Sequence, residues 1–234
     1  MTLKKVYLSP SVQQGNLFVV GDVTEEQNSN LVTDILEKAL KNKYGITVYR
    51  NSPSMTLAQI IADSNAKAPD IHVSIHSNAG GGRGCEVYAY LISGKTTNSQ
   101  KLAQYMYNEF SAITPSTDRG IKNGVTASLG EIVKTSATAV LVEMAFHDNK
   151  EDAAWLIANR QACATAFEKA ICSYFGISYI TDSTASTPDY QTLYKEAQAS
   201  IASLQSQFTS KEAELAAVKD KYDKLVAALK ALLP

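Results

Sequence analysis

The sequence has little of what builds disulfide frameworks, membrane spans or polyanion-binding surfaces. Its 234 residues include three cysteines, Cys85, Cys163 and Cys172, an odd number without C-x-x-C spacing, so neither a disulfide framework nor a zinc ribbon is predicted. Lys and Arg number 22 against 23 Asp and Glu, and this balance gives no reason to expect nucleic acid or an anionic membrane as a partner. No apolar run approaches the roughly 20 residues of a transmembrane helix.

The amino-terminal segment also has little of a secretory signal. Lys4 and Lys5 precede an apolar stretch of only a few residues, whereas the apolar region of a signal peptide runs to about 7–15 residues. We therefore expect synthesis in the cytoplasm without a signal peptide. If the protein acts outside the cell, another route must release it.

What the sequence does have is a regular alternation of short β-branched runs and amphipathic segments. Thr24 and Gln27 have the spacing of a helix-capping box, and Gly45 is placed to end that helix. Further helices are expected at 57–66, 100–110 and from 148 to about 174, and strands at 4–9, 46–49, 71–76, 85–91, near 131–133 and at 139–142. This order predicts an α/β fold with a mainly parallel sheet flanked by helices on both faces.

The pattern changes after a polar linker at 179–189, which separates an expected catalytic domain at 1–178 from a tail at 190–234. Apolar residues then recur in alternating steps of four and three, with one polar break at Lys211. The seam comprises Tyr190, Tyr194, Ala197, Ile201, Leu204, Phe208, Leu215, Val218, Tyr222, Leu225, Leu229 and Leu232. A long helix cannot bury such a narrow stripe alone, so we expect a coiled coil that self-associates. The alternative is a helix folded back on the catalytic domain.

The strand at 71–75 runs directly into His76 and then into the loop SNAGGG, which places an imidazole at the sheet edge where ligands bind in open α/β folds. A metal site there needs three protein ligands and a water. Glu26, at a helix start after a long loop, is favoured over Glu25 as a second ligand because Asn30 follows one turn later and could orient it. Glu143 bounds the strand at 139–142 and is interpreted as a general base. Taken singly, each residue also suits a purely structural role.

Four separated motifs then carry a family resemblance. TEEQNSN, SIHSNA with its glycine-rich loop, CEVYAY and LVEMAF occur in an order that resembles the zinc-dependent N-acetylmuramoyl-L-alanine amidases of the amidase_3 type, over about residues 3–177. The resemblance implies Zn²⁺ as cofactor, with Glu26 and His76 among its ligands and Glu143 as the catalytic acid–base. It also implies peptidoglycan as the substrate, cut between N-acetylmuramic acid and L-alanine, as in a phage or prophage endolysin acting on the cell wall after release.

The first zinc-binding histidine of that family is missing. The family carries it in a Gly-His-Gly type turn after the first strand, but here the loop reads SPSVQQ over residues 9–14. His147 lies four residues after Glu143 in the loop leaving the same strand, so we expect it to fold back and complete a two-His, one-carboxylate set. The alternatives are Gln13 or Gln14 as a weak amide ligand, or a site that binds no metal.

Two functions are compatible with these residues. The first is an active zinc amidase whose coiled coil links several catalytic heads and raises avidity for the polymeric wall. The second is a metal-free wall-binding or structural protein that keeps the fold, although the retained Glu143 favours the enzyme. Asn78 and Arg119 are candidates for contacting glycan or peptide stem. His72, about 13 Å from His76 along the strand, is interpreted as a core or helix-packing histidine.

Overall fold

The computed structural model describes residues 3–115, 119–181 and 190–231. The chain forms two compact units, Met1–Ile180 and Thr181–Pro234. Most of the expected linker at 179–189 lies outside the described residues. Among the helices that are described, none is long and apolar enough to cross a membrane.

The first unit is built on a six-stranded sheet in the order β2-β1-β3-β6-β4-β5. All neighbouring strands are parallel except β4 and β6, which run antiparallel. The strands are β1 (Lys5–Pro10), β2 (Thr47–Arg50), β3 (Ile71–Asn78), β4 (Glu86–Ala89), β5 (Ile121–Asn123) and β6 (Thr138–Phe146). The expected α/β class with a mainly parallel sheet is confirmed, and the one antiparallel pair makes the sheet mixed.

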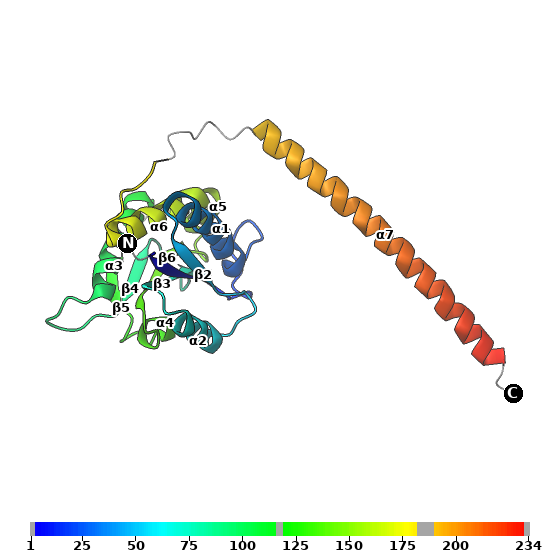
Figure 1. Ribbon diagram of the computed structural model, residues 1–234, viewed down its shortest axis with the longest axis horizontal. Coiled ribbons are helices and arrows are strands. Elements are labelled where there is room, and N and C mark those ends of the chain that lie inside the picture. The colour runs from blue at the N-terminus through cyan, green and yellow to red at the C-terminus, as the bar shows by residue number, and fades with distance from the viewer. Residues whose placement is uncertain (1–2, 116–118, 182–189, 232–234) are drawn as a thin grey trace. The chain divides into compact units, whose positions relative to one another are not determined.

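Helices cover both faces of this sheet (Figure 1). They are α1 (Glu25–Tyr44), α2 (Leu57–Lys67), α3 (Asn98–Ile113), α4 (Gly130–Val133), α5 (Lys150–Ala158) and α6 (Arg160–Phe175). In Figure 1, α2 and α4 lie on one side of the sheet, and α1, α5 and α6 lie on the other. The expected capping box of Thr24 and Gln27 opens α1, and Gly45 ends it in the left-handed conformation at φ 62°.

The two faces of the sheet differ in polarity because successive strand residues point to opposite sides. One set of alternate positions, which includes Val73, Ile75 and Val142, packs into the main hydrophobic core. The other set includes His72, His76 and Glu143 and faces α2 and α4. This polar face of a buried sheet contains the candidate site.

Two expectations about strands were wrong. Residues near 131–133 form the helical turn α4, in which the amides of Ile132 and Val133 both donate to the carbonyl of Leu129. Residues 131–133 read Glu-Ile-Val, and a run of three residues is too short for its periodicity to distinguish a strand from a helical turn. Strand β6 also continues past Glu143 to Phe146, so Glu143 lies within the strand and does not end it.

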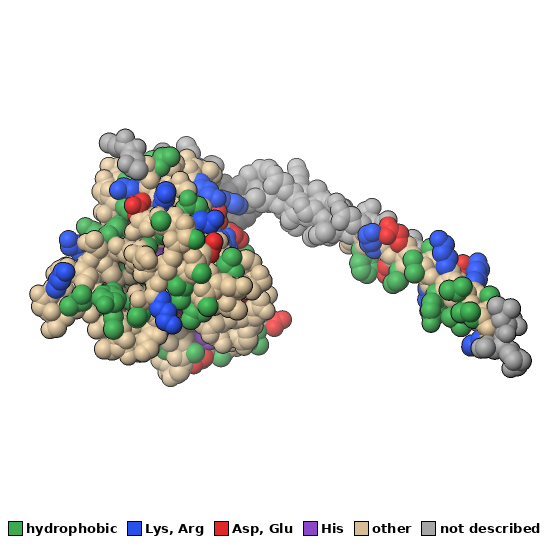
Figure 2. Space-filling view, turned by 60° about the horizontal axis from the view of Figure 1, so that its bottom comes forward, with side chains coloured by type: hydrophobic (Ala, Val, Ile, Leu, Met, Phe, Trp, Pro, Cys, Tyr) green, Lys and Arg blue, Asp and Glu red, His purple; other side chains and the backbone are tan. Residues whose placement is uncertain are grey.

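The second unit contains one helix, α7 (Tyr190–Ala231). Its expected seam is exposed wherever side chains are described, from 55% at Leu229 to 69% at Leu215. Figure 2 shows these apolar side chains beside charged ones along the helix. The seam residues before Phe208, together with Leu232, lie outside the described side chains. The coiled coil therefore stays a prediction.

Candidate active site

The structure places Glu25, not Glu26, against His76. The Nδ1 atom of His76 lies 2.9 Å from Oε1 of Glu25, whose side chain is almost fully buried. The inward face of α1 carries Glu25, Asn28, Ser29 and Val32, and Glu26 is rotated from that face by about 100°. Its carboxylate accepts from Asn30 at 2.8 Å, which confirms the expected Asn30 contact. The expectation that Glu26 joins His76 was wrong.

Glu25 is held by donors on both of its oxygens. The amide of Ser77 donates to Oε1 at 3.3 Å, and Nδ2 of Asn16 donates to Oε2 at 2.7 Å. Asn16 also donates to Oε1 of Gln13 at 2.9 Å, which ties the loop after β1 to the helix start. Burial acts to raise the pKa of Glu25, but the hydrogen bond from His76 and the other donors hold it below its usual range. Glu25 is therefore an ionised carboxylate in the interior.

The other side of His76 faces Glu131, a residue that sequence reasoning missed. Oε1 of Glu131 lies 3.9 Å from Nε2 of His76, and its Oε2 accepts from Nε2 of His72 at 2.6 Å. His72 is fully buried, as expected, with Nδ1 2.9 Å from Ser64 Oγ and its ring stacked on Tyr7. The H-x-S-x-H spacing at 72–76 was the available signal, because residues two apart share one face of a strand.

Glu143 is the third acid of the site and is the register partner of His76 between the parallel strands β3 and β6. Its Oε2 is buried and has no hydrogen-bond partner among the described residues. Burial, together with the charges of Glu25 and Glu86, raises the pKa of Glu143 to about 7 against the opposing effect of His76. Burial alone would lower the pKa of His76, but the hydrogen bond and charge of Glu25, with Glu143 and Glu131, raise it to about 9. A carboxyl with a pKa near neutrality can both accept and donate a proton.

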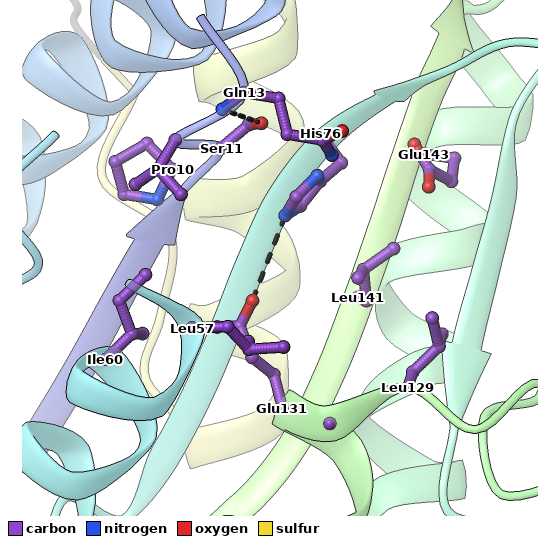
Figure 3. Close-up of a pocket in the computed structure, with 12 residues that line it drawn as sticks. Pro10, Ser11, Gln13, Leu57, Ile60, His76, Leu129, Glu131, Leu141 and Glu143 are labelled. Carbon is purple, nitrogen blue, oxygen red and sulfur yellow. Dashed lines mark hydrogen bonds and ion pairs between the residues drawn. The ribbon is translucent and has the colours of Figure 1, made fainter. Parts of the chain in front are cut away.

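These groups open onto a cavity of about 310 Å³ between the ends of β1, β3 and β6 and the helices α2 and α4. Figure 3 shows His76 and Glu131 on one wall and Glu143 on the neighbouring strand. The remaining lining is mostly apolar and comes from Pro10, Val12, Leu57, Ile60, Leu129 and Leu141. An apolar cavity with a few convergent polar groups is the usual form of a small-ligand or active site.

His147 does not join His76, contrary to the expectation. Its Nδ1 donates to the carbonyl of Ser77 at 3.0 Å and lies 3.1 Å from Ser77 Oγ. Its ring stacks on Phe18 at 5.6 Å. Ser77 follows His76 in β3, so its side chain points to the opposite face of the sheet. His147 is thus held on the face away from the cavity.

Replacing His147 with Ala should therefore reduce stability without disabling the site. The side chain is 5% exposed, and losing its stacking and hydrogen bonds should lower the free energy of unfolding by about 2–3 kcal/mol. Urea unfolding measures this loss, and kcat/KM per folded molecule should stay within about threefold of wild type. A fully stable but inactive variant would contradict the structural role.

The candidate contacts Asn78 and Arg119 both lie on one buried acid, Glu86. Asn78 Nδ2 donates to Oε1 of Glu86 at 2.7 Å, and Arg119 Nε donates to Oε2 at 2.6 Å. Glu86 in turn is the cross-strand partner of Glu143. Sequence reasoning missed Glu86, because it lies in an ordinary alternating strand and its partners are distant in the chain.

The described residues do not fit a three-ligand zinc site. Glu25 and His76 supply two donors in contact, but within the described part of the chain no group of three or more His, Cys, Asp or Glu side chains is placed to hold a metal ion. The expected set of Glu26, His76 and His147 is not assembled. Of the amide alternatives, Gln13 lines the cavity and accepts from Asn16.

Comparison with known proteins places these residues in a family. A family model described as Amidase_3, N-acetylmuramoyl-L-alanine amidase, matches residues 13–173. The chain is 30% identical over 154 residues to the N-acetylmuramoyl-L-alanine amidase CwlM of Bacillus licheniformis, covering 64% of this chain and 59% of that protein. It is 33% identical over 141 residues to the endolysin of Bacillus phage SPP1, covering 56% and 51%. The chain thus spans a little over half the length of these relatives.

Solved structures agree on the fold. The catalytic domain of CwlV, an N-acetylmuramoyl-L-alanine amidase from Bacillus (Paenibacillus) polymyxa var. colistinus, superposes with a TM-score of 0.66 at 22% identity, over 75% of this chain and 100% of that one. The catalytic domain of the CD27L endolysin gives 0.58 at 19% identity, over 76% and 100%. The family match extends over more than half of the sequence, and the chain therefore belongs to the amidase_3 family of N-acetylmuramoyl-L-alanine amidases.

Proposed function

We propose that this protein is a peptidoglycan hydrolase that cleaves the amide between the lactyl group of N-acetylmuramic acid and L-alanine. Family membership supports the reaction class. The observation that carries the proposal is Glu143, a buried carboxyl beside an apolar cavity. One of its oxygens has no hydrogen-bond partner in the described part of the chain, and its pKa is raised to about 7. A metal-free binding protein would have no use for this costly group.

The roles of the residues follow from their positions. Glu143 accepts a proton from the attacking water and then passes it to the nitrogen of the leaving L-alanine. His76 is oriented by its hydrogen bond to Glu25, and Glu131 lies 3.9 Å from its other ring nitrogen, which faces the cavity. Apolar side chains such as Leu57 and Leu141 exclude water around the scissile amide.

We further propose Zn²⁺ as the cofactor, which the family relationship supports. Glu25 and His76 would be its donors in this chain, and a bound zinc would supply Lewis-acid polarisation of the carbonyl and activation of water. Because the described residues do not complete a three-ligand set, the roles given above belong to the side chains alone. Metal analysis of protein purified without chelator tests this part: about one zinc per chain supports the cofactor, and protein without zinc contradicts it.

The reaction is tested by the chemistry of the products. Digestion of purified cell walls should release new amino termini on alanine, in step with the loss of turbidity, without new reducing sugar ends. Reducing ends would indicate cleavage of the glycan and would overturn the proposal. Wall binding without any new amino termini would instead support the binding-protein alternative.

The tail is proposed to be a coiled coil that joins several catalytic units, as in an endolysin-like enzyme that acts on the cell wall after release. Support comes from the exposed seam of α7, where Leu215, Val218 and Leu225 are each more than 60% exposed. Water-exposed apolar stripes of this length are stabilised by packing against a partner helix.

We expect the full chain to sediment as an oligomer, and the double variant Val218→Glu/Leu225→Glu to sediment as a monomer with unchanged hydrolysis of small muropeptides. The two substitutions remove apolar contacts between the helices, and the glutamates of neighbouring helices repel one another. Analytical ultracentrifugation over a range of concentrations measures the change. Changing Lys219 and Lys221, which lie off the seam, to Gln provides the control. A monomeric wild type would refute self-association.

A further inference from the structure

We propose that Arg119 and Lys122, held side by side on Glu86, form a subsite for an acidic group of the peptide stem. The inference rests on the proposed function and specifies which part of the substrate the site selects. It assigns Lys122 and Glu86 roles of their own, with Glu86 as a positioning residue.

The cluster lies on the same edge of the sheet as the catalytic carboxyl. Glu86 at the start of β4 is the cross-strand partner of Glu143, Lys122 lies in β5, and Arg119 comes from the chain that enters β5. Both cations contact Oε2 of Glu86, whose side chain is only 2% exposed. In the sheet order, β4 with Glu86 lies next to β6 with Glu143, and β5 with Lys122 lies one strand further along the same sheet.

Arg119 is held in a defined orientation by its neighbours. The guanidinium of Arg119 lies over the Phe146 ring at 4.9 Å from its centroid, and Glu86 fixes its Nε. Gly82 packs against the same ring so tightly that a Cβ there would come within 2.4 Å of it. Arg119 is therefore positioned before any ligand arrives, which reduces the entropy lost on binding.

The charges of the cluster do not balance. One buried carboxylate faces two cations, and hydrogen bonds and charges from Lys122 and Arg119 keep the pKa of Glu86 below its usual range despite burial. Among the described residues, Glu86 is the one acid seen in an ion pair with either cation. Arg119 and Lys122 are each about one-third exposed. Counted over the described residues, the cluster therefore carries one positive charge in excess, on side chains that are partly accessible.

Substrate chemistry identifies which group could use this charge. In the proposed substrate, the lactyl carboxyl of N-acetylmuramic acid is already consumed in the scissile amide, so the glycan side is uncharged. Carboxylates occur only on the peptide side, beyond L-alanine. A subsite with excess positive charge next to Glu143 therefore selects the peptide, and charge-assisted hydrogen bonds give it strength.

Two matched muropeptides test the inference: N-acetylmuramoyl-L-alanyl-D-glutamate, which has an additional α-carboxylate, and its D-isoglutamine counterpart, which has an amide there. Wild type should prefer the glutamate form by about tenfold in kcat/KM, through a lower KM. Lys122→Met and Arg119→Met should each remove most of that preference. Lys169→Met, on α6 at the opposite face of the sheet, should retain it.

Calorimetric binding of both ligands to the Glu143→Gln protein makes the result independent of turnover. The subsite is supported if the ligand with the additional carboxylate binds more tightly and Lys122→Met abolishes that difference. This holds even if hydrolysis fails and the proposed function is overturned. Equal affinity of the wild-type cluster for both ligands overturns the subsite, even if the amidase is active. The subsite is also overturned if Lys122→Met lowers the affinity for both ligands equally, because Lys122 would then have only a structural role.

Discussion

Replacing Glu143 with Gln is expected to lower kcat/KM for a muropeptide substrate by about 10²–10⁴-fold, the usual contribution of a general acid–base. Gln has the same shape but cannot take up a proton from water. Removing a buried carboxylate with an unpartnered oxygen should not destabilise the fold, because its burial is costly in the charged form. Alanine amino-terminus release measures activity, and thermal unfolding measures stability.

The pH profile provides a second readout of the same residue. The base form of Glu143 exists above its pKa, which is raised to about 7, so kcat/KM should rise with pH through about 7 and then level off. The control is Glu151→Gln, because Glu151 on α5 is 74% exposed. This variant should have the same kcat/KM as wild type and the same rise of kcat/KM through about pH 7. An active Glu143→Gln enzyme with the wild-type pH limb would rule out Glu143 as the base.

Glu25→Gln and Glu26→Gln should differ sharply although the residues are adjacent. Every N–H donor around Glu25 comes from His76, Ser77 or Asn16, and a Gln amide would turn its own N–H₂ toward one of them. We expect a loss of about 2–4 kcal/mol in the free energy of unfolding. Activity should fall by about 10²-fold because His76 loses its orientation.

Glu26→Gln serves as the matched control. Its carboxylate contacts Asn30 on the partly exposed side of α1, so stability should change by less than about 0.5 kcal/mol, with activity close to wild type. Where wild type purifies with zinc, Glu25→Gln should lose the metal and Glu26→Gln should keep it. The opposite ranking of the two variants would return the site to Glu26 and contradict the buried face of α1.

Much of the fold could be predicted from local signals. The capping box of Thr24 and Gln27 and the left-handed Gly45 are decided by residues a few positions apart, and both are present in the structure. The β-branched run at 71–75 and its polar loop correctly placed His76 at the sheet edge. By contrast, the short run near 131–133 forms the helical turn α4 and not the expected strand, because three residues are too few to show a period.

The site depended on contacts that no local pattern encodes. Whether Glu25 or Glu26 faces inward depends on the rotation of α1 as it packs on the sheet, and one residue changes the direction by about 100°. His147 is turned away because its ring finds Phe18 and Ser77 on the opposite face.

The sequence by itself therefore determined most of the order of helices and strands, apart from β5 and α4, together with the family and the choice of His76 and Glu143, which line one cavity. Short-range periodicity and motif order were sufficient for these. Only the tertiary structure decided that Glu25 supports His76, that Glu131 lies between His72 and His76, and that Glu86 gathers Arg119 and Lys122. These partners are separated by 33 to 59 residues in the chain. The physical reason is that side-chain convergence across a sheet edge is set by strand register and helix packing, which become defined only when distant segments meet.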